Sequence, residues 1–83
     1  MEVRLSQKAA KYLSSMNQPD KGRIAKALDK LQKEPPQGDI TALSGKDGYR
    51  LRVGSYRILF DITEKLVDIR VIAPRGQVYK GGL

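Results

Sequence analysis

Three arginines stand in a run of alternating residues around a Gly54-Ser55 dipeptide. A two-residue Gly-X loop of this kind fixes the register of a β-hairpin, so the spacing predicts that Arg52 lies directly opposite Arg57. Because side chains alternate between the two faces of a strand, both arginines share one face with Arg50. Like charges directly opposite each other destabilise a sheet by roughly 0.2–1 kcal/mol. The cluster therefore either binds an anion or forms the solvated outer face of a one-sided sheet.

The overall charge favours an anionic partner. Sixteen Lys and Arg residues against nine Asp and Glu residues give a net charge of +7 on 83 residues, with an isoelectric point near 9.9. This balance is typical of proteins that bind nucleic acid or an acidic partner. Charge by itself indicates the class of partner but not the mechanism.

Composition also limits the kind of protein. The chain has no cysteine and no histidine, and its acidic residues are scattered, so we expect no metal and no other cofactor. No apolar run approaches membrane-spanning length, and the N-terminus lacks a secretory signal. We therefore expect a cytoplasmic protein with no membrane partner. At this length the chain predicts one domain over residues 1–83.

Apolar spacing predicts the elements that precede the arginines. Residues 2–5 alternate as a short strand that ends at Ser6, a suitable helix N-cap. An amphipathic helix follows, with its apolar stripe over residues 9–16. Asp20 is placed to cap a second helix, which repeats the stripe over residues 24–31. Two consecutive prolines then end the second helix.

The second half of the chain predicts strands. Residues 40–43 form a short extended connection in this interpretation. The hairpin strands cover residues 49–53 and 56–60, and a further strand covers residues 66–73. The residues of this last strand on the apolar side are Val67, Ile69 and Val71.

Helices followed by strands indicate an α+β fold. We expect the N-terminal strand and the helical hairpin to pack on one face of an antiparallel β-meander of three strands. Arg50, Arg52 and Arg57 then lie on the opposite, open face. That face is where a ligand of the arginines would bind.

A second basic cluster follows the last predicted strand. It contains Arg75, Tyr79 and Lys80 and carries the motif Arg-x-x-Val-Tyr. Together with the hairpin sequence over residues 48–60 and the Leu-Ser-Gly lead-in at residues 43–45, this motif resembles the RelE/ParE toxin superfamily. The Arg-x-x-Val-Tyr ending favours the RelE branch. The resemblance covers essentially the whole chain.

The resemblance implies a toxin of a type II toxin–antitoxin pair with a RelE-like microbial RNase fold. Toxins of that branch are endoribonucleases that cleave mRNA in the ribosomal A site without a metal ion, and so inhibit translation. The implied partners are a cognate antitoxin, the ribosome and mRNA.

Positions that match the family carry implied roles. Arg57 corresponds to the arginine that holds the scissile phosphate, and Arg75 to the basic residue after the last strand. Tyr79 corresponds to the tyrosine that stacks on or acts at the cleaved nucleotide, which completes the implied catalytic set. The implied RNA-binding residues are Arg50, Arg52, Lys46 and Lys80. This chain departs from the family in carrying arginine where a lysine would exchange protons more readily, and in lacking the C-terminal helix of some members.

The residue types limit how such a cleavage would proceed. Without histidine or a cluster of acidic residues, a histidine pair and a two-metal nuclease are excluded. Arginines stay protonated and bind two phosphate oxygens at once, so they suit stabilisation of charge in the transition state but are poor bases. Tyr79, among cations that favour its phenolate, is the better candidate for the base. Lys46 and Lys80 are the alternatives.

Two other functions are compatible with the same fold. A toxin of the ParE branch binds DNA gyrase and has no nuclease activity, and a non-catalytic module would hold RNA on its basic face. Individual residues also keep two interpretations. Arg50 and Lys46 serve either as phosphate contacts or for solubility, and Tyr79 either acts on RNA or packs the end of the chain.

Overall fold

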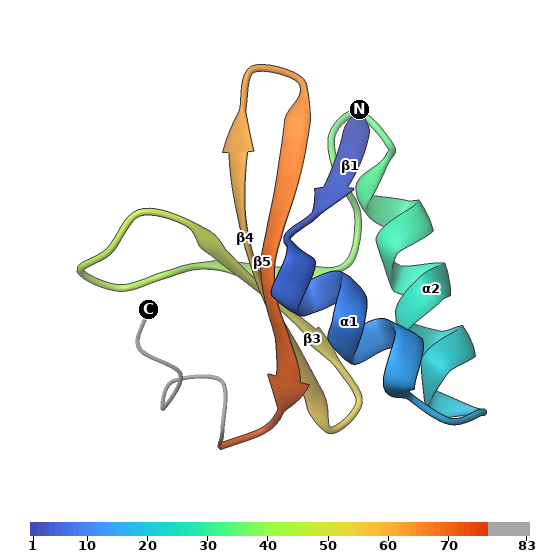
Figure 1. Cartoon of the computed structure of the whole chain (residues 1–83). Helices are drawn as coiled ribbons and strands as arrows, with labels where there is room; N and C mark the ends of the chain where they lie inside the picture. Colours follow the sequence, from blue (N-terminus) through green and yellow to red (C-terminus); the bar gives the residue numbers. More distant parts are fainter. Residues whose placement is uncertain (77–83) are drawn as a thin grey trace.

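An open five-stranded sheet carries two helices on one of its faces (Figure 1). The structure is a computed structural model that describes residues 1–76. No helix in that part of the chain is both long and apolar enough to cross a membrane. The elements in chain order are β1 (Glu2–Leu5), α1 (Gln7–Ser15), α2 (Asp20–Leu31), β2 (Asp39–Ala42), β3 (Tyr49–Val53), β4 (Tyr56–Thr63) and β5 (Leu66–Pro74).

The sheet confirms the predicted α+β fold and extends it at both edges. Its strand order is β1-β5-β4-β3-β2, with β1 parallel to β5 and the other neighbours antiparallel. Residues 39–42, most of which were predicted as a connection, pair with β3 as an edge strand. The N-terminal strand was expected on one face of the sheet, but it joins the sheet beside β5. Only the two helices therefore form the second layer.

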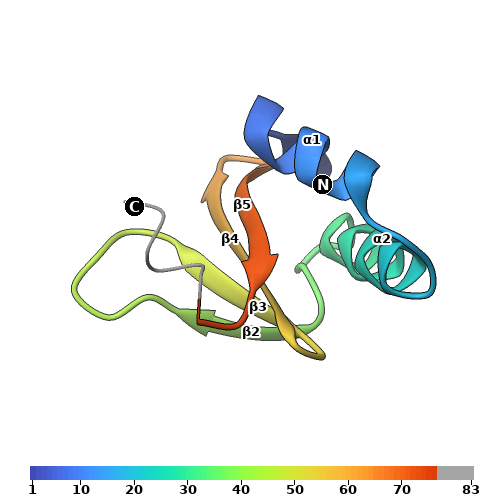
Figure 2. The same cartoon turned by 60° about the horizontal axis from the view of Figure 1, so that its bottom comes forward.

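The apolar core lies between the helices and one face of the sheet (Figure 2). Ala9 of α1 and Ile24 and Leu31 of α2 are fully buried, in agreement with the predicted stripes. The sheet contributes the buried side chains of Leu51, Ile58, Phe60, Val67 and Ile69. Burial of an aliphatic or phenyl side chain stabilises the fold by about 1.5–3 kcal/mol. This packing fixes the helices on one face and leaves the other face to the arginines.

The β3–β4 hairpin has the predicted register. Gly54 lies in its turn with a φ of 57°, a left-handed conformation that glycine adopts without steric cost. Arg52 therefore lies directly opposite Arg57. The other pairs are Val53 with Tyr56, Leu51 with Ile58, Arg50 with Leu59 and Tyr49 with Phe60.

A β-bulge in β5 changes which residues face the core. Leu59 pairs with Val71, whereas the next residue of β4 pairs with Ile69, so Arg70 is an extra residue in β5. The prediction that Val71 lies on the same side as Ile69 is therefore wrong. Val71 packs with Leu59 in a small apolar cluster apart from the main core, and Ile72 takes its place in that core.

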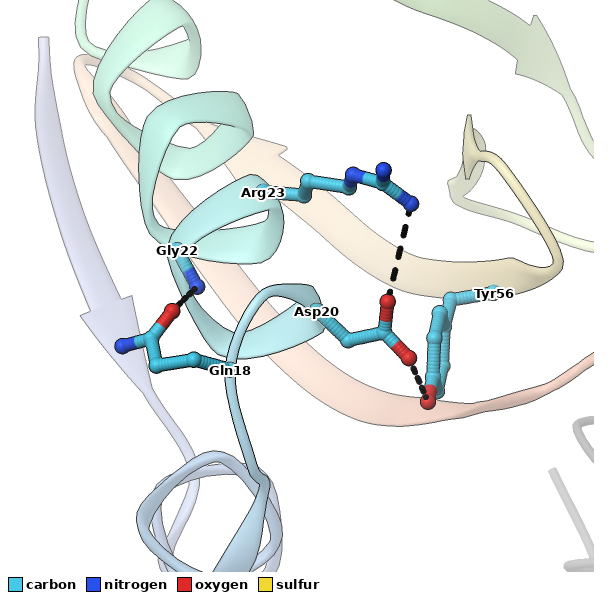
Figure 3. Close-up of polar contacts among 5 residues, drawn as sticks. All are labelled: Gln18, Asp20, Gly22, Arg23 and Tyr56. Atoms are coloured by element: carbon cyan, nitrogen blue, oxygen red, sulfur yellow. Dashed lines mark hydrogen bonds and ion pairs between the residues drawn. The ribbon is translucent and has the colours of Figure 1, made fainter.

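The two helices begin in different ways. Ser6 caps α1 as predicted, because its Oγ accepts a hydrogen bond from the Ala9 amide at 3.0 Å. The prediction that Asp20 caps α2 is wrong, because Asp20 lies inside the first turn of that helix. Instead, the side-chain oxygen of Gln18 accepts a hydrogen bond from the Gly22 amide at 3.0 Å (Figure 3). Gln18 therefore accepts from one of the amide groups at the start of α2 that have no partner within the helix.

Asp20 has other partners (Figure 3). Its carboxylate accepts a hydrogen bond from the Tyr56 hydroxyl at 2.9 Å and lies 3.6 Å from the Arg23 guanidinium. The hydrogen bond to Asp20, with partial burial, raises the pKa of Tyr56 above its ordinary value. This contact ties the start of α2 to the β3–β4 hairpin.

Candidate functional site

Four arginines line one cavity on the face of the sheet opposite the helices. Its volume is about 340 Å³, and its lining residues are Arg50, Arg52, Arg57, Arg75 and Gly76. We call this the arginine cavity. Within residues 1–76, no acidic residue lines it. The cavity therefore offers positive charge and hydrogen-bond donors to an anion of modest size.

Backbone pairing brings these arginines together from three strands. Arg50 and Arg52 are alternate residues of β3, and Arg57 faces Arg52 from β4. Arg75 directly follows β5, and its amide donates a hydrogen bond to the Ser55 carbonyl at 2.7 Å. This bond holds the chain after β5 against the hairpin turn. The local register and one backbone contact thus build the cavity.

Arg57 is buried, although the sequence predicted an open face for its side chain. Its exposed fraction is 7%. Its Nη1 donates hydrogen bonds to the Tyr56 carbonyl at 2.8 Å and to the Gly54 carbonyl at 3.1 Å. The guanidinium is thus held in place by the backbone of its own hairpin. Since burial lowers the local dielectric, its charge acts on a bound anion more strongly than an exposed charge would.

Arg52 is held more loosely at the edge of the cavity. Its Nε lies 3.6 Å from a carboxylate oxygen of Asp39, the residue opposite it on β2. More than half of each side chain is exposed, at 53% for Arg52 and 62% for Asp39. Exposed ion pairs contribute roughly 0–1 kcal/mol, so this pair does not prevent Arg52 from contacting a ligand.

The remaining predicted site residues fall into two groups. Arg50 is half-buried and lines the arginine cavity. Lys46 is exposed and lines a separate, smaller cavity of about 80 Å³ formed with the 43–48 loop, so the structure does not bring it to the four arginines. Tyr79 and Lys80 lie outside the described residues.

Arg70 is a cation at this smaller cavity that the sequence analysis did not single out. The bulge in β5 allows its guanidinium to form an ion pair with Asp61 of β4. Both residues line the smaller cavity beside Lys46. The adjacent apolar residues Val71 and Ile72, which break strict alternation, were the sequence signal for this bulge.

The charges of the arginine cavity suit phosphate. Arg52 and Arg57 face each other with like charge, which an anion between them would relieve. Guanidinium groups bind phosphate through paired hydrogen bonds and remain charged at any physiological pH. Within residues 1–76, no three His, Cys, Asp or Glu side chains gather closely enough to hold a metal ion.

Solved structures of toxins share this fold. The chain is 28% identical to a chain of the archaeal RelE–RelB complex from Pyrococcus horikoshii, with a TM-score of 0.76 over 92% of this chain and 96% of that one. The isolated RelE toxin of Escherichia coli is 15% identical, with a TM-score of 0.73 over 95% of this chain and 90% of that one. The RelB–RelE antitoxin–toxin complex from Methanococcus jannaschii is 20% identical, with a TM-score of 0.75 over 95% of this chain and 98% of that one.

The family match and the shared fold identify a toxin of the RelE/ParE superfamily, as the sequence motifs predicted. No curated protein matches the chain. The model of the ParE toxin of type II toxin–antitoxin systems matches residues 3–79, and the chain belongs to that family. This protein is therefore the toxin of a toxin–antitoxin pair, with a RelE-like fold.

Proposed function

We propose that this toxin is a ribosome-dependent, metal-independent endoribonuclease. It cleaves mRNA in the ribosomal A site and so inhibits translation in the cytoplasm, acting as one domain over residues 1–83. The observation that carries this proposal is the lining of one open cavity by four arginines, with no acidic residue from residues 1–76 among them. A cavity of that charge fits the phosphate of an RNA backbone.

The arginines supply electrostatic stabilisation in this mechanism. The 2′-hydroxyl oxygen of the ribose attacks the adjacent phosphorus, a new P–O2′ bond forms, and the P–O5′ bond breaks. Negative charge builds on the phosphate oxygens during this step. Arg57 is fixed by two carbonyls before any ligand binds, so its charge is preorganised for that moment. Arg50, Arg52 and Arg75 complete the ring around the phosphate.

The chain offers fewer side chains suited to proton transfer than to stabilisation of charge. The base that accepts the 2′-hydroxyl proton is Tyr79 in this proposal, with Lys80 as the other group that could exchange protons, because Lys46 lines a different cavity. The 5′-oxygen of the leaving nucleotide must in turn gain a proton. Since arginine serves poorly for either task, the ribosome is expected to position the RNA and so supply much of the rate enhancement.

A cognate antitoxin is the proposed protein partner. Toxins of this fold are found in complexes with antitoxins, as in the RelE–RelB structures. The net charge of +7 favours an acidic partner and fast electrostatic capture at low salt. An acidic segment of the antitoxin would neutralise the toxin directly if it covered the arginine cavity.

A second candidate function is binding to DNA gyrase without nuclease activity. The observation that favours it is the match to the ParE family model over residues 3–79. In that case the arginine cavity would contact an acidic surface of the target protein. The two candidate functions predict different assay results for the same purified toxin: cleaved mRNA in one case and inhibited supercoiling in the other.

A pair of assays on the full chain separates these functions. Programmed ribosomes test for cleavage of mRNA, and a supercoiling reaction tests for inhibition of gyrase. Ribosome-dependent cleavage that falls by about 10²–10³-fold in Arg75→Met is expected, because one charge contact in the transition state is lost. Lys8→Met, on the exposed surface of α1, is the matched control and should cleave normally. Inhibited supercoiling with intact mRNA would overturn the ribonuclease proposal.

A further inference from the structure

A second cavity lies between α2 and the edge of the sheet. Its volume is about 270 Å³, and its wall includes three cations from α2, one cation from β3 and one carboxylate, that of Asp39. The cations are Arg23, Lys26, Lys30 and Arg52, and all four residues are exposed. The cavity is therefore basic and accessible, and it is separate from the small cavity that Lys46 lines.

The three cations of α2 form one stripe. Positions 23, 26 and 30 follow the i, i+3, i+7 spacing that places side chains on the same face of a helix. With a rise of about 1.5 Å per residue, the stripe is about 10 Å long. Arg23 extends from α2 toward the β3–β4 hairpin (Figure 3). The stripe therefore starts close to the hairpin and runs along α2 away from it.

Arg52 lines both the arginine cavity and the cavity beside α2. The position of β2 explains how one side chain does this. The first residue of β2, Asp39, pairs with Arg52, so beyond that pair β3 is itself the edge of the sheet. A side chain at the edge is accessible from both faces. The two cavities thus meet at Arg52.

We propose that the α2 stripe and Arg52 form a continuous basic track that binds the backbone of single-stranded RNA. The nucleotide whose phosphate occupies the arginine cavity would be followed, on one side, by phosphates held along α2. This inference rests on the proposed function, since it requires RNA in the arginine cavity. It adds a second contact surface and a direction in which the strand leaves the site.

The composition of the cavity favours RNA over a protein helix. Its apolar lining consists of Ala27, Leu51 and Val53, of which Leu51 is already buried in the core. No aromatic or other large apolar side chain from residues 1–76 in this lining offers an anchor of the kind that dominates protein interfaces. The carboxylates near the arginines hold them at 3.6 Å in exposed pairs, which phosphate oxygens can replace at little cost.

Binding of labelled oligouridine to the full chain tests the track. Two probes are used, of about four and about twelve nucleotides, so that only the longer one extends beyond the arginine cavity. The double variant Lys26→Ala/Lys30→Ala removes two cations of the stripe. The matched control is Lys8→Ala/Lys11→Ala, which removes the same charge from the exposed surface of α1. Anisotropy titrations across a range of salt give the affinities.

We expect a change only in the α2 variant, and only in its binding of the longer probe. Each phosphate contact to a single strand adds about 0.7 to the slope of log affinity against log salt, so the α2 variant should lose about 1.4 for the longer RNA. Between about 50 and 200 mM salt, the wild type should then weaken about sevenfold more than this variant. The short probe should bind both proteins alike.

Other outcomes overturn the inference in distinguishable ways. Equal losses in the α1 and α2 variants would mean that net charge, and not a track, binds the longer RNA. Normal RNA binding by the α2 variant, with loss of its complex with the co-expressed antitoxin, would identify the cavity as a protein site. Absence of RNA binding by the wild type would refute the track, whereas the proposed function would be refuted separately, by intact mRNA in the assay with programmed ribosomes.

Discussion

Replacing Arg57 with methionine would separate the structural contribution of this guanidinium from its contribution to ligand binding. The methionine keeps an apolar stem in the buried position but removes the charge and its hydrogen bonds. One guanidinium nitrogen donates to both the Gly54 and the Tyr56 carbonyls. We count these two contacts as one charged hydrogen bond, whose loss costs about 1.5–3 kcal/mol.

An opposing effect reduces this loss of stability. Arg52 lies directly opposite Arg57, and removing one of two facing like charges returns roughly 0.2–1 kcal/mol. The net destabilisation of Arg57→Met should therefore be about 0.5–2.8 kcal/mol. In a domain of this size, each kcal/mol lowers Tm by about 4–8 °C.

Thermal and urea unfolding followed by circular dichroism would measure this difference. Arg75→Met is the matched control, because the Arg75 side chain is exposed and its hydrogen bond to Ser55 comes from the backbone. That variant should stay within about 0.5 kcal/mol of the wild type. An unchanged Tm in Arg57→Met would refute the reasoning that Arg57 holds the hairpin turn.

Three further predictions concern the parts that support the site. Tyr56→Phe should lose less stability at high pH than the wild type does. Because the pKa of Tyr56 is raised, its bond to Asp20 stabilises the fold below about pH 10 and is lost as pH rises through the folded-state pKa. Unfolding measured between neutral and alkaline pH tests this. Gly48→Ala should cost more than about 1 kcal/mol in urea unfolding, because its φ is 114° and a Cβ would lie 2.8 Å from a carboxylate oxygen of the β4 aspartate. Gly45→Ala, where a Cβ meets nothing within 4 Å, should cost less. Leu59→Ala should cost about 2–5 kcal/mol despite lying outside the main core, and a near-normal urea midpoint would contradict its burial.

The hairpin could be predicted from the sequence because its signals are local. A Gly-Ser turn between two alternating runs permits one register, and a shift by one residue would have exposed every apolar side chain. The structure has that register. The apolar stripes of both helices were equally local, and their residues face the core.

The errors arose where distant residues decide local structure. Asp20 lies inside the first turn of α2, and its carboxylate binds Tyr56, 36 positions later in the chain, instead of capping the helix. Val71 faces away from the main core because a bulge adds Arg70 to β5, and the ion pair of Arg70 with Asp61 depends on the neighbouring strand. The edge strand β2 also depends on its partner, since it has only four residues and only Ile40 among them is partly buried.

The candidate site was predictable in part. Register and chain order correctly suggested that Arg75 joins the hairpin arginines at one cavity. The burial of Arg57 was not predictable, because it depends on carbonyl groups that carry no sequence signal. Lys46 lies at a different cavity because the loop before β3 leads away from the arginines. The roles of Tyr79 and Lys80 stay predictions.

Mapping the ends of mRNA after incubation of the 83-residue toxin with programmed ribosomes tests the central claim most directly. Action in the ribosomal A site predicts cuts confined to the A-site codon. Attack by the 2′-hydroxyl predicts a 2′,3′-cyclic phosphate on one fragment and a 5′-hydroxyl on the other. These ends should disappear in Arg75→Met and persist in Lys8→Met. Intact mRNA, or fragments that carry 5′-phosphates, would contradict the proposal that the arginine cavity cleaves RNA by charge stabilisation.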